Sequence, residues 1–307
     1  MPLFSVIIPC FNHAAFVGEA IESILAQSMG DLELIVVDDC SRDSSKEVIE
    51  KFVASDPRVR SIYHEVNQGI SPTRDDAIRV ANGQYLAFCD ADDVWMPTKL
   101  ARQLELLEKH PGHYVAYCDA AIINEYGIET GERFSDQFPV PGNGSGRLFD
   151  KLCTRNFINI QTAILRRECI TEAGYFDDGE GIKLVDDWWF WLRVSYRNLF
   201  VYSDEVLAKY RVHQGSTGAV QRPAYKINRI KLFHRILRHY PGISSKAKSE
   251  IYYHIGMALA GLGRKRFARR CFIRAMQFKR SNLRALCRML LSFPRVPAWH
   301  FHMRPGV

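Results

Sequence analysis

Short apolar runs alternate with longer amphipathic segments from residue 4 to about residue 90, and this alternation restricts the fold more than any other part of the sequence. Runs such as Phe4–Pro9, Leu32–Val37 and Gln84–Cys89 have the length of buried strands, whereas the segments between them repeat apolar residues at helical spacing. Strands that alternate with helices predict a mostly parallel sheet with helices packed on its faces. We therefore expect an α/β fold with a Rossmann-like sheet.

The same spacing rules predict further strands, further helices and one long loop. Strands are expected over Arg58–His64, Tyr114–Cys118, Gln161–Leu165 and Leu199–Tyr210. Helices are expected over Ala15–Ala26, Ser44–Ala54, Ser71–Val80, Pro97–Lys109 and Asp187–Tyr196. Residues 127–147 are rich in Gly and Pro and predict a loop.

Charge is divided unevenly along the chain. The formal net charge is +7, but residues 222–307 carry +19, with 20 Lys plus Arg against the single acid Glu250, so the first 221 residues carry −12. Beyond residue 218 the apolar residues follow helical spacing, and over 252–276 this spacing is typical of one tetratricopeptide-like hairpin. We expect two domains, an α/β domain at 1–218 and a small, basic, all-helical region at 219–307.

The composition argues against membrane-spanning and disulfide-rich proteins. Hydrophobic residues make up 47% of the chain, and no apolar run reaches the roughly 18 residues of a membrane-spanning helix. Residues 1–9 lack the basic and small-residue features of a signal peptide. The eight cysteines stand singly, with no CxxC pair, which is typical of reduced thiols rather than of disulfides or zinc ligands. A cytoplasmic protein is expected.

Acidic residues directly follow two of the predicted strands. Asp38 and Asp39 end the second strand, and Asp90, Asp92 and Asp93 follow the fourth, at the edge where such sheets bind ligands. Three carboxylates within four residues repel one another unless a cation neutralises them, and Mg²⁺ or Mn²⁺ prefers oxygen ligands. The cluster predicts a metal–diphosphate site, with a solvated acidic turn as the alternative. For Asp39, contact with a nucleotide and capping of the next helix both stay open.

Five linked motifs follow one another along the first part of the chain: SVIIPCFN at 5–12, AIESILAQ at 20–27, ELIVVDDCS at 33–41, NQG at 67–69 and GQYLAFCDADD at 83–93. In order and spacing they resemble family 2 glycosyltransferases of the GT-A fold, and the resemblance covers roughly residues 4–218. It implies an inverting transferase that uses a nucleotide-diphosphate sugar, often linked to UDP, with a divalent metal ion, Mn²⁺ or Mg²⁺.

The resemblance also implies roles in donor binding for individual residues. Pro9 and Phe11 would line the nucleotide pocket, and Asp39 would contact the base. Asp90 would contact the ribose, and Asp92 would bind the metal ion.

Two basic segments resemble parts of the family that meet the diphosphate. Arg74 matches an arginine that the family commonly places in an Ala-Arg-Asn string; here the string is Thr73-Arg74-Asp75, which puts a functional role of Asp75 in doubt. A surface ion pair is the alternative for Arg74. Near the end of the domain, His213 would complete the metal coordination or touch the diphosphate, and Arg211 would meet the phosphate; a structural histidine is the alternative for His213.

The segment VDDWWFWLR at 185–193 resembles the acidic pair and aromatic-rich helix of the family. It implies that Asp187 is the catalytic base, which takes a proton from the acceptor hydroxyl, with a helix N-cap as the alternative. Asp186 would orient this base or bind the acceptor. Trp189 and Trp95 are the candidate stacking contacts for the acceptor sugar, with packing in the core as the alternative.

The resemblance thus implies a hexosyl- or N-acetylhexosaminyl-transferase that acts in the synthesis of cell-surface polysaccharide, lipopolysaccharide or another glycan. One alternative is a nucleotidyltransferase, against which the lack of glycine at 4–12 argues, because those enzymes usually begin with a Gly-rich phosphate loop. The other alternative is a catalytically silent scaffold that binds nucleotide sugars.

The basic tail has two candidate partners, an anionic membrane surface and the acidic catalytic domain of a partner subunit. We favour peripheral contact with the cytoplasmic face of a membrane, because it suits a lipid-linked glycan acceptor. Nucleic acid is not expected, because no recognised binding motif accompanies the charge.

Overall fold

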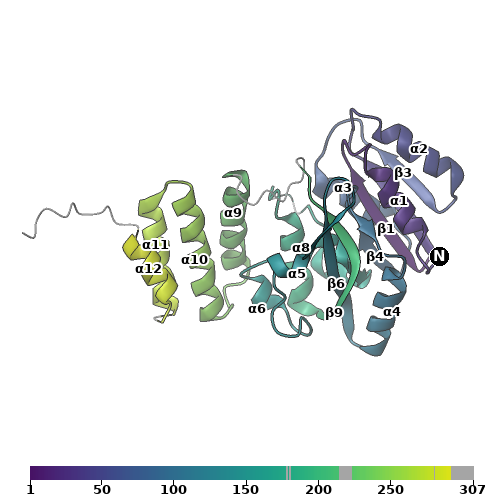
Figure 1. Ribbon diagram of the computed structural model, residues 1–307. Helices are drawn as coiled ribbons and strands as arrows, with labels where there is room; N and C mark the ends of the chain where they lie inside the picture. Colours follow the sequence, from purple (N-terminus) through teal and green to yellow (C-terminus); the bar gives the residue numbers. More distant parts are fainter. Residues whose placement is uncertain (178, 180, 214–222, 280, 292–307) are drawn as a thin grey trace, which may run out of the picture. The chain divides into compact units, whose positions relative to one another are not determined.

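The computed structural model describes residues 1–177, 179, 181–213, 223–279 and 281–291. The chain divides into two compact units, Met1–Val220 and Gln221–Val307. The described part of the first unit is built on one nine-stranded sheet, in the order β3-β2-β1-β4-β8-β6-β9-β5 with β7 paired to β6, and helices flank this sheet (Figure 1). The predicted α/β fold with a Rossmann-like sheet is confirmed.

One half of the sheet is parallel and corresponds to the alternating part of the sequence. Its elements are β1 (Phe4–Cys10), α1 (Val17–Leu25), β2 (Leu32–Asp38), α2 (Ser45–Ser55), β3 (Val59–Tyr63), α3 (Ile70–Val80) and β4 (Tyr85–Phe88). Each lies within two residues of its predicted bounds. Every residue of β1 is buried, as expected for a strand covered on both faces, and this burial explains its continuous apolar run.

The other half of the sheet corrects the expectation of a mostly parallel arrangement. Strand β8 (Ala163–Arg166) runs antiparallel to β4 and β6 (His113–Ile123), whereas β9 (Leu199–Arg211) runs parallel to β6. Strand β5 (Val94–Trp95) is antiparallel to β9. An apolar run gives the position of a strand but not its direction, which depends on the path of the connecting segments.

The stretch predicted as a loop at 127–147 contains β7 (Glu129–Arg133) and the short helix α5 (Phe134–Gln137). All five residues of β7 are exposed, so this strand carries none of the apolar alternation by which strands are predicted. The remaining helices of this unit are α4 (Lys99–Lys109), α6 (Phe149–Leu152), α7 (Glu168–Ala173) and α8 (Asp186–Arg197).

Gly83 permits the close approach of the chain entering β4 to β1. A Cβ atom at this position would lie 2.3 Å from the backbone nitrogen of Ser5, a distance that no side chain tolerates. The backbone N–H of Gly83 also donates a hydrogen bond to Ser5 Oγ at 2.7 Å. A glycine is therefore required where β4 begins beside β1.

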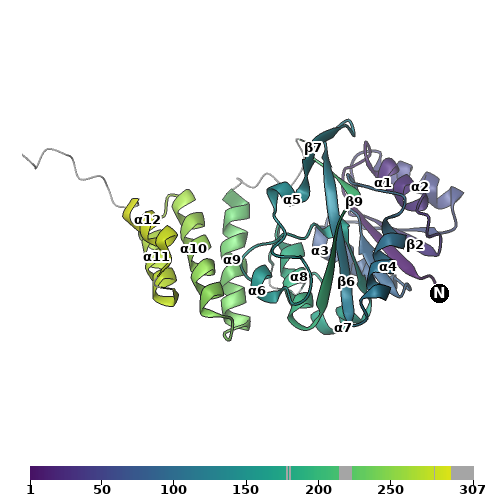
Figure 2. The same ribbon diagram turned by 60° about the horizontal axis from the view of Figure 1, so that its bottom comes forward.

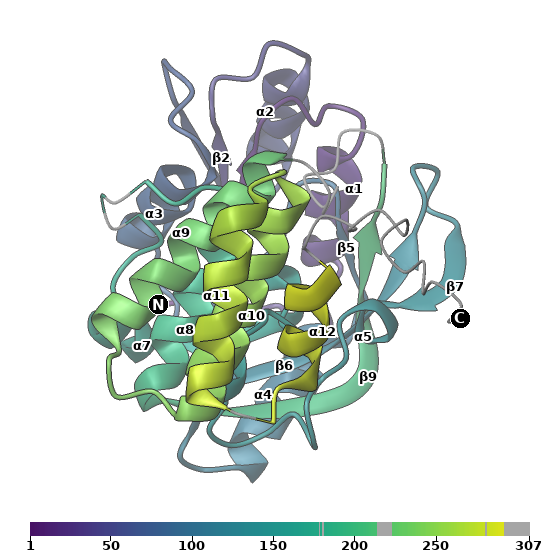
Figure 3. The same cartoon turned by 90° about the vertical axis from the view of Figure 1, so that its left-hand side faces the viewer.

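The second unit contains α9 (Pro223–His239), α10 (Ser245–Gly261), α11 (Lys265–Phe278) and α12 (Leu283–Leu291) among its described residues. Helices α10 and α11 lie side by side (Figures 2 and 3), with Gly256 against the ring of Phe272. In α11, Phe267 is 57% exposed, whereas the neighbouring Ala268 is buried. Within the described part of the chain, helices with both the length and the apolar character needed to cross a bilayer are absent.

Candidate active site

Four chain segments meet at the carboxyl edge of the parallel strands. β1 ends at Cys10, beside Asp38 at the end of β2, and the acidic loop at 90–93 follows β4 on the other side of β1. β9 reaches the same loop from the far half of the sheet, because it pairs with β5, which begins directly after the loop. The segments 10–13, 38–41, 90–93 and 211–213 are thereby brought together.

The three carboxylates of the acidic loop have three different environments. Asp93 is 1% exposed and accepts a hydrogen bond from the backbone N–H of Arg211 at 2.8 Å. Burial raises the pKa of Asp93 well above its usual value, and the neighbouring Asp92 and Asp90 raise it further. Asp93 therefore has a structural role in the loop, and Asp90 and Asp92 are the two carboxylates that remain as candidates for binding a ligand.

Arg211 holds the acidic loop from β9. Its Nε donates to the carbonyl oxygen of Asp92 at 2.7 Å, and its guanidinium also pairs with Glu19. The side chain of Arg211 is 2% exposed, with the guanidinium turned into the protein. This geometry corrects the predicted phosphate contact, because Arg211 uses its donors to position the loop.

Asp92 faces two histidines. Its Oδ2 lies 3.0 Å from Nε2 of His213 and 3.9 Å from Nε2 of His13, and the three candidate ligand atoms lie within 4.8 Å of one another. Two ligand atoms that each lie about 2.1 Å from a divalent ion, at right angles, are about 3.0 Å apart, so the Asp92–His213 spacing fits a metal ion. The structure brings the two predicted metal ligands, Asp92 and His213, together, and His13 lies beside them.

His13 was missed at the sequence level. It lies three residues beyond β1, in a loop at the carboxyl edge of the sheet, and this position is the signal by which it could have been found.

Arg74, on α3, joins the acidic loop to the start of α8. Its Nη2 donates to Asp90 Oδ1 at 2.8 Å, and its Nη1 donates to Asp186 Oδ2 at 2.9 Å. Burial alone would lower the pKa of Arg74, but Asp90 and Asp186 raise it above the usual value. The alternative of a surface ion pair is wrong, because the residue is 2% exposed.

Asp187 lies in the first turn of α8 and is partly exposed. The N-cap of this helix is Val185, so Asp187 is not the helix cap. Burial raises the pKa of Asp187 to about 7, with a further contribution from the negative charge of Asp186. A carboxylate with this pKa is a stronger base than an ordinary aspartate and is still ionised in good part at neutral pH.

Asn156 holds Asp187 in place, and sequence reasoning missed it. Its Nδ2 donates to Asp187 Oδ2 at 3.1 Å, while its Oδ1 accepts a hydrogen bond from the backbone N–H of Ile158. The two side chains are 31 positions apart and share no motif, so the sequence alone carries no signal for this pair.

Asp75 fixes the segment that leads toward α8. Its two carboxylate oxygens accept hydrogen bonds from the backbone N–H groups of Phe176 and Asp177, each at 2.8 Å. Burial raises the pKa of Asp75 to about 6. Its role in the structure is therefore to position this segment.

Asp39 anchors the NQG loop. Its oxygens accept hydrogen bonds from the backbone N–H groups of Gln68 and Gly69, each at 2.8 Å, and His64 Nδ1 lies 2.8 Å from Oδ1. Of the two predicted wall residues, Pro9 is buried in β1 and Phe11 is 40% exposed beyond it. Contact of these residues with a nucleotide stays a prediction.

The burial of Trp95, Trp189 and Asp186 argues against the predicted contact of these residues with the acceptor. Trp95 is 2% exposed beneath Lys99, whose Nζ lies 4.0 Å from the ring centroid, and Trp189 is 3% exposed. Asp186 is also buried, paired with Arg74. Helix α8 is buried on most of its circumference, so its aromatic side chains fill the core rather than face a sugar.

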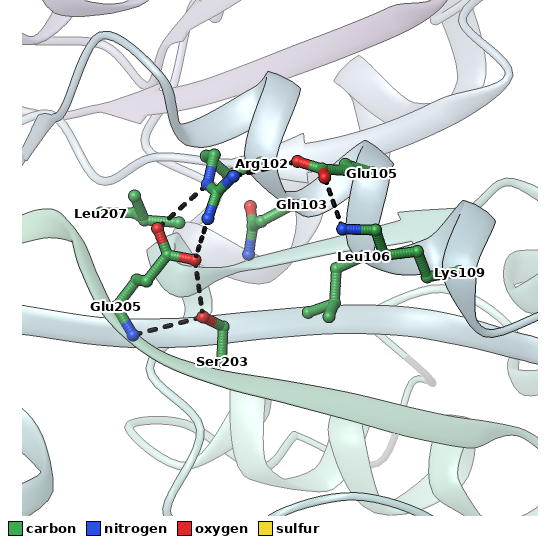
Figure 4. Close-up of a pocket in the computed structure, with 8 residues that line it drawn as sticks. All are labelled: Arg102, Gln103, Glu105, Leu106, Lys109, Ser203, Glu205 and Leu207. Atoms are coloured by element: carbon green, nitrogen blue, oxygen red, sulfur yellow. Dashed lines mark hydrogen bonds and ion pairs between the residues drawn. The ribbon is translucent and has the colours of Figure 1, made fainter.

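A shallow hollow between α4 and β9 lies apart from these acids (Figure 4). Most of its polar side chains bind one another: Arg102 donates to both carboxylate oxygens of Glu205, at 3.0 and 2.9 Å, and Lys109 pairs with Glu105. The residues that carry chemistry at the sheet edge do not line it, so it is not part of the candidate site.

Two solved structures illustrate the likeness of fold. The structure of Staphylococcus aureus TarS 1-349 has a TM-score of 0.62 and 18% identity, over 94% of this chain and 88% of that chain. The mannosyltransferase PcManGT from Pyrobaculum calidifontis, in complex with GDP-Man and Mn²⁺, has a TM-score of 0.64 and 19% identity, over 95% of this chain and 79% of that chain. At this identity the likeness shows the fold alone.

Two curated relatives are similar in sequence. The "Putative teichuronic acid biosynthesis glycosyltransferase TuaG" of Bacillus subtilis is 39% identical over 106 residues, which is 34% of this chain and 42% of that protein. An "Uncharacterized glycosyltransferase" of Haemophilus influenzae is 38% identical over 124 residues, which is 39% of this chain and 49% of that protein. The chain spans about half the length of the curated relatives it matches. Residues 5–172, more than half of the chain, match the model of "Glycosyl transferase family 2", and the chain therefore belongs to this family.

Proposed function

We propose that the chain is an inverting glycosyltransferase that moves a sugar from a nucleotide-diphosphate sugar, with a UDP-sugar as the favoured donor, to an acceptor hydroxyl. The observation that carries the proposal is the Arg74 network, which joins the acidic pair Asp186–Asp187 to the loop that contains Asp90 and Asp92. A single displacement needs a base on one side of the reacting carbon and stabilisation of the leaving group on the other. The network supports such an arrangement.

In the proposed reaction Asp187 accepts the proton of the acceptor hydroxyl. The acceptor oxygen forms a bond to the anomeric carbon of the donor while the bond from that carbon to the diphosphate oxygen breaks, so no covalent enzyme intermediate forms. Asn156, 3.1 Å from Asp187 Oδ2, keeps the carboxylate in position. The raised pKa of Asp187, about 7, supports this role because it makes the carboxylate basic enough to take the proton.

The proposed cofactor is Mn²⁺ or Mg²⁺, held by Asp92 and His213, which lie 3.0 Å apart. When bound, a divalent ion supplies positive charge that stabilises the leaving diphosphate. Asp90 and Arg74 would adjoin the ribose and diphosphate, and Pro9, Phe11 and Asp39 would contact the base.

The proposal is tested by a donor assay. UDP-, GDP- and dTDP-sugars are incubated with wild-type protein and with Asp187→Asn, with Mn²⁺ and with a chelator, and both transfer and donor hydrolysis are recorded. We expect one donor to react in the wild type and to react about 10²- to 10⁴-fold more slowly in Asp187→Asn, with unchanged donor binding by calorimetry. Near-normal turnover of the variant would remove Asp187 as the base.

Donor binding without transfer or hydrolysis in the wild type would instead favour the silent scaffold. Formation of a nucleotide-activated product from a nucleoside triphosphate would favour a nucleotidyltransferase.

For the substrate, we propose a hexosyl or N-acetylhexosaminyl donor and a glycan or lipid-linked glycan acceptor of cell-surface polymer synthesis. Support comes from the relatives: the name of TuaG refers to teichuronic acid biosynthesis, and solved structures of similar fold contain UDP-GlcNAc and GDP-Man.

For the basic helical unit, we propose peripheral contact with an anionic lipid surface at the cytoplasmic face of a membrane. One face of α11 is exposed and combines charge with apolar side chains: Arg266, Arg270 and Arg274 accompany Phe267, which is 57% exposed, and Ile273, which is 44% exposed. Each cationic side chain near the membrane surface contributes about 1 kcal/mol of attraction to anionic head groups, and apolar side chains enter the interface.

Vesicle sedimentation tests this contact. We expect the protein to sediment with phosphatidylserine vesicles at low salt and not with phosphatidylcholine vesicles, and we expect Arg266→Glu with Arg270→Glu to remain in the supernatant. The control variant, Lys46→Glu with Lys51→Glu on α2, changes the charge equally and should still sediment. Absence of wild-type binding at low salt would remove the membrane proposal and favour a protein partner.

A further inference from the structure

His13, in the loop after β1, is held as a metal-binding histidine is held. Its Nδ1 lies 2.8 Å from the carbonyl oxygen of Phe11. A carbonyl oxygen only accepts hydrogen bonds, so Nδ1 carries the proton and Nε2 of the neutral ring carries the lone pair. Histidines that bind metals commonly donate their other ring N–H to a backbone carbonyl in this way.

The lone-pair nitrogen of His13 lies on the side of Asp92 and His213. Nε2 of His13 is 3.9 Å from Asp92 Oδ2, the same oxygen that lies 3.0 Å from Nε2 of His213. The two imidazole rings stand at 90° with centroids 6.1 Å apart, and Phe16 packs against both rings. Rings in this orientation can direct one nitrogen each to a common point. His13 is 29% exposed, so a small rotation can close the wider spacing.

We infer that His13 is a third protein ligand of the divalent cation, in a site of two imidazole nitrogens and one carboxylate oxygen. The inference rests on the proposed function for the presence of the cation and deepens it by selecting the metal. Imidazole binds transition-metal ions in preference to Mg²⁺, which favours oxygen ligands. The site should therefore select Mn²⁺ over Mg²⁺, and three protein ligands leave coordination positions for phosphate oxygens.

Binding of Mn²⁺ alone, without donor or acceptor, tests the inference. The wild-type chain and the variants His13→Ala and His110→Ala are titrated with Mn²⁺ up to millimolar concentration, and nitrogen couplings are measured by pulsed electron paramagnetic resonance. His110 is a matched control because its Nδ1 likewise lies close to a backbone carbonyl oxygen, 2.9 Å from that of Leu106, at the end of α4.

We expect couplings to two imidazole nitrogens in the wild type and in His110→Ala, and to one in His13→Ala. Mn²⁺ should bind His13→Ala at least tenfold more weakly, and Mg²⁺ should displace it at a lower ratio of Mg²⁺ to Mn²⁺. Thermal unfolding checks that His13→Ala is folded, and His13→Gln serves as a second variant if it is not. Equal Mn²⁺ affinity in the His13 variant, two nitrogen couplings in that variant, or no Mn²⁺ binding by the wild type would overturn the inference.

The result is independent of sugar transfer. Two-nitrogen Mn²⁺ binding without any transfer would remove the proposed function and leave the His13 site intact. If the wild type transfers sugar but its bound Mn²⁺ shows a single nitrogen coupling, the proposed function stands and the His13 site is removed.

Discussion

Asp92 and Asp187 belong to one network at the carboxyl edge of the sheet but have different surroundings. Asp92 faces the imidazoles of His13 and His213. Asp187 lies next to the buried Asp186, and burial together with this neighbour raises its pKa to about 7. Nitrogen ligands around a carboxylate suit a cation, whereas a raised pKa suits the uptake of a proton. The comparison teaches that the neighbours of an aspartate, rather than its residue type, assign its chemistry.

The largest expected effect comes from amide substitution at each of these acids. Asp187→Asn should lower kcat by about 10²- to 10⁴-fold, because the amide cannot accept the proton, while Mn²⁺ and donor still bind. Asp92→Asn should weaken Mn²⁺ binding and metal-dependent donor binding, because a charged ligand is lost. Calorimetry and steady-state kinetics on both variants check this division. If both variants lost metal binding, or neither did, the division of roles would be contradicted.

Substitution of Arg74 tests the link between the two acidic sites. Arg74→Met should lower the free energy of unfolding by about 3–5 kcal/mol, because it leaves the buried Asp186 without its cationic partner. Arg102→Met is the control, since Arg102 pairs with Glu205 at an exposed position, where an ion pair contributes about 0–1 kcal/mol. Urea unfolding measures both. Equal losses in the two variants would show that the Arg74 network does not stabilise the fold as a buried pair should.

The pH dependence of turnover should reflect Asp187. Because its pKa is raised to about 7, the carboxylate is protonated below this pH and cannot act as a base. We expect kcat to fall as pH decreases through about 7, approaching tenfold per pH unit. The residual activity of Asp187→Asn should lack this acid limb. An acid limb of the same position in the variant would assign it to another group.

Asn156→Ala should give the smallest of these effects. It removes a hydrogen bond to the ionised form of Asp187, so the apparent pKa of the acid limb should rise, and kcat at pH 8 should fall about tenfold. Asn143→Ala, in the loop where Asn143 Oδ1 accepts a hydrogen bond from Ser145, is the matched control and should leave the profile unchanged. An unshifted profile in Asn156→Ala would remove Asn156 as a positioning residue.

The parallel half of the fold was predictable because its signals are local. Apolar runs buried on both faces mark β1, β2 and β4, and helical spacing marks α1 to α3. The exposed strand β7 has no such signal, and the direction of β8 is not encoded in its four residues. A short apolar strand pairs equally well in either direction until the connecting chain sets its path.

The sequence by itself determined the α/β class, the family and the placement of Asp38, Asp39 and the acidic loop at strand ends, because these depend on neighbouring residues. Only the tertiary structure decided which acid meets which partner. Arg74 and Asp186 are 112 positions apart, and Asp92 and His213 are 121 positions apart.

Tertiary packing also placed Trp95 and Trp189 in the core and turned Arg211 inward. Contacts of this kind arise when separate elements pack against each other, and no periodicity within one element encodes them.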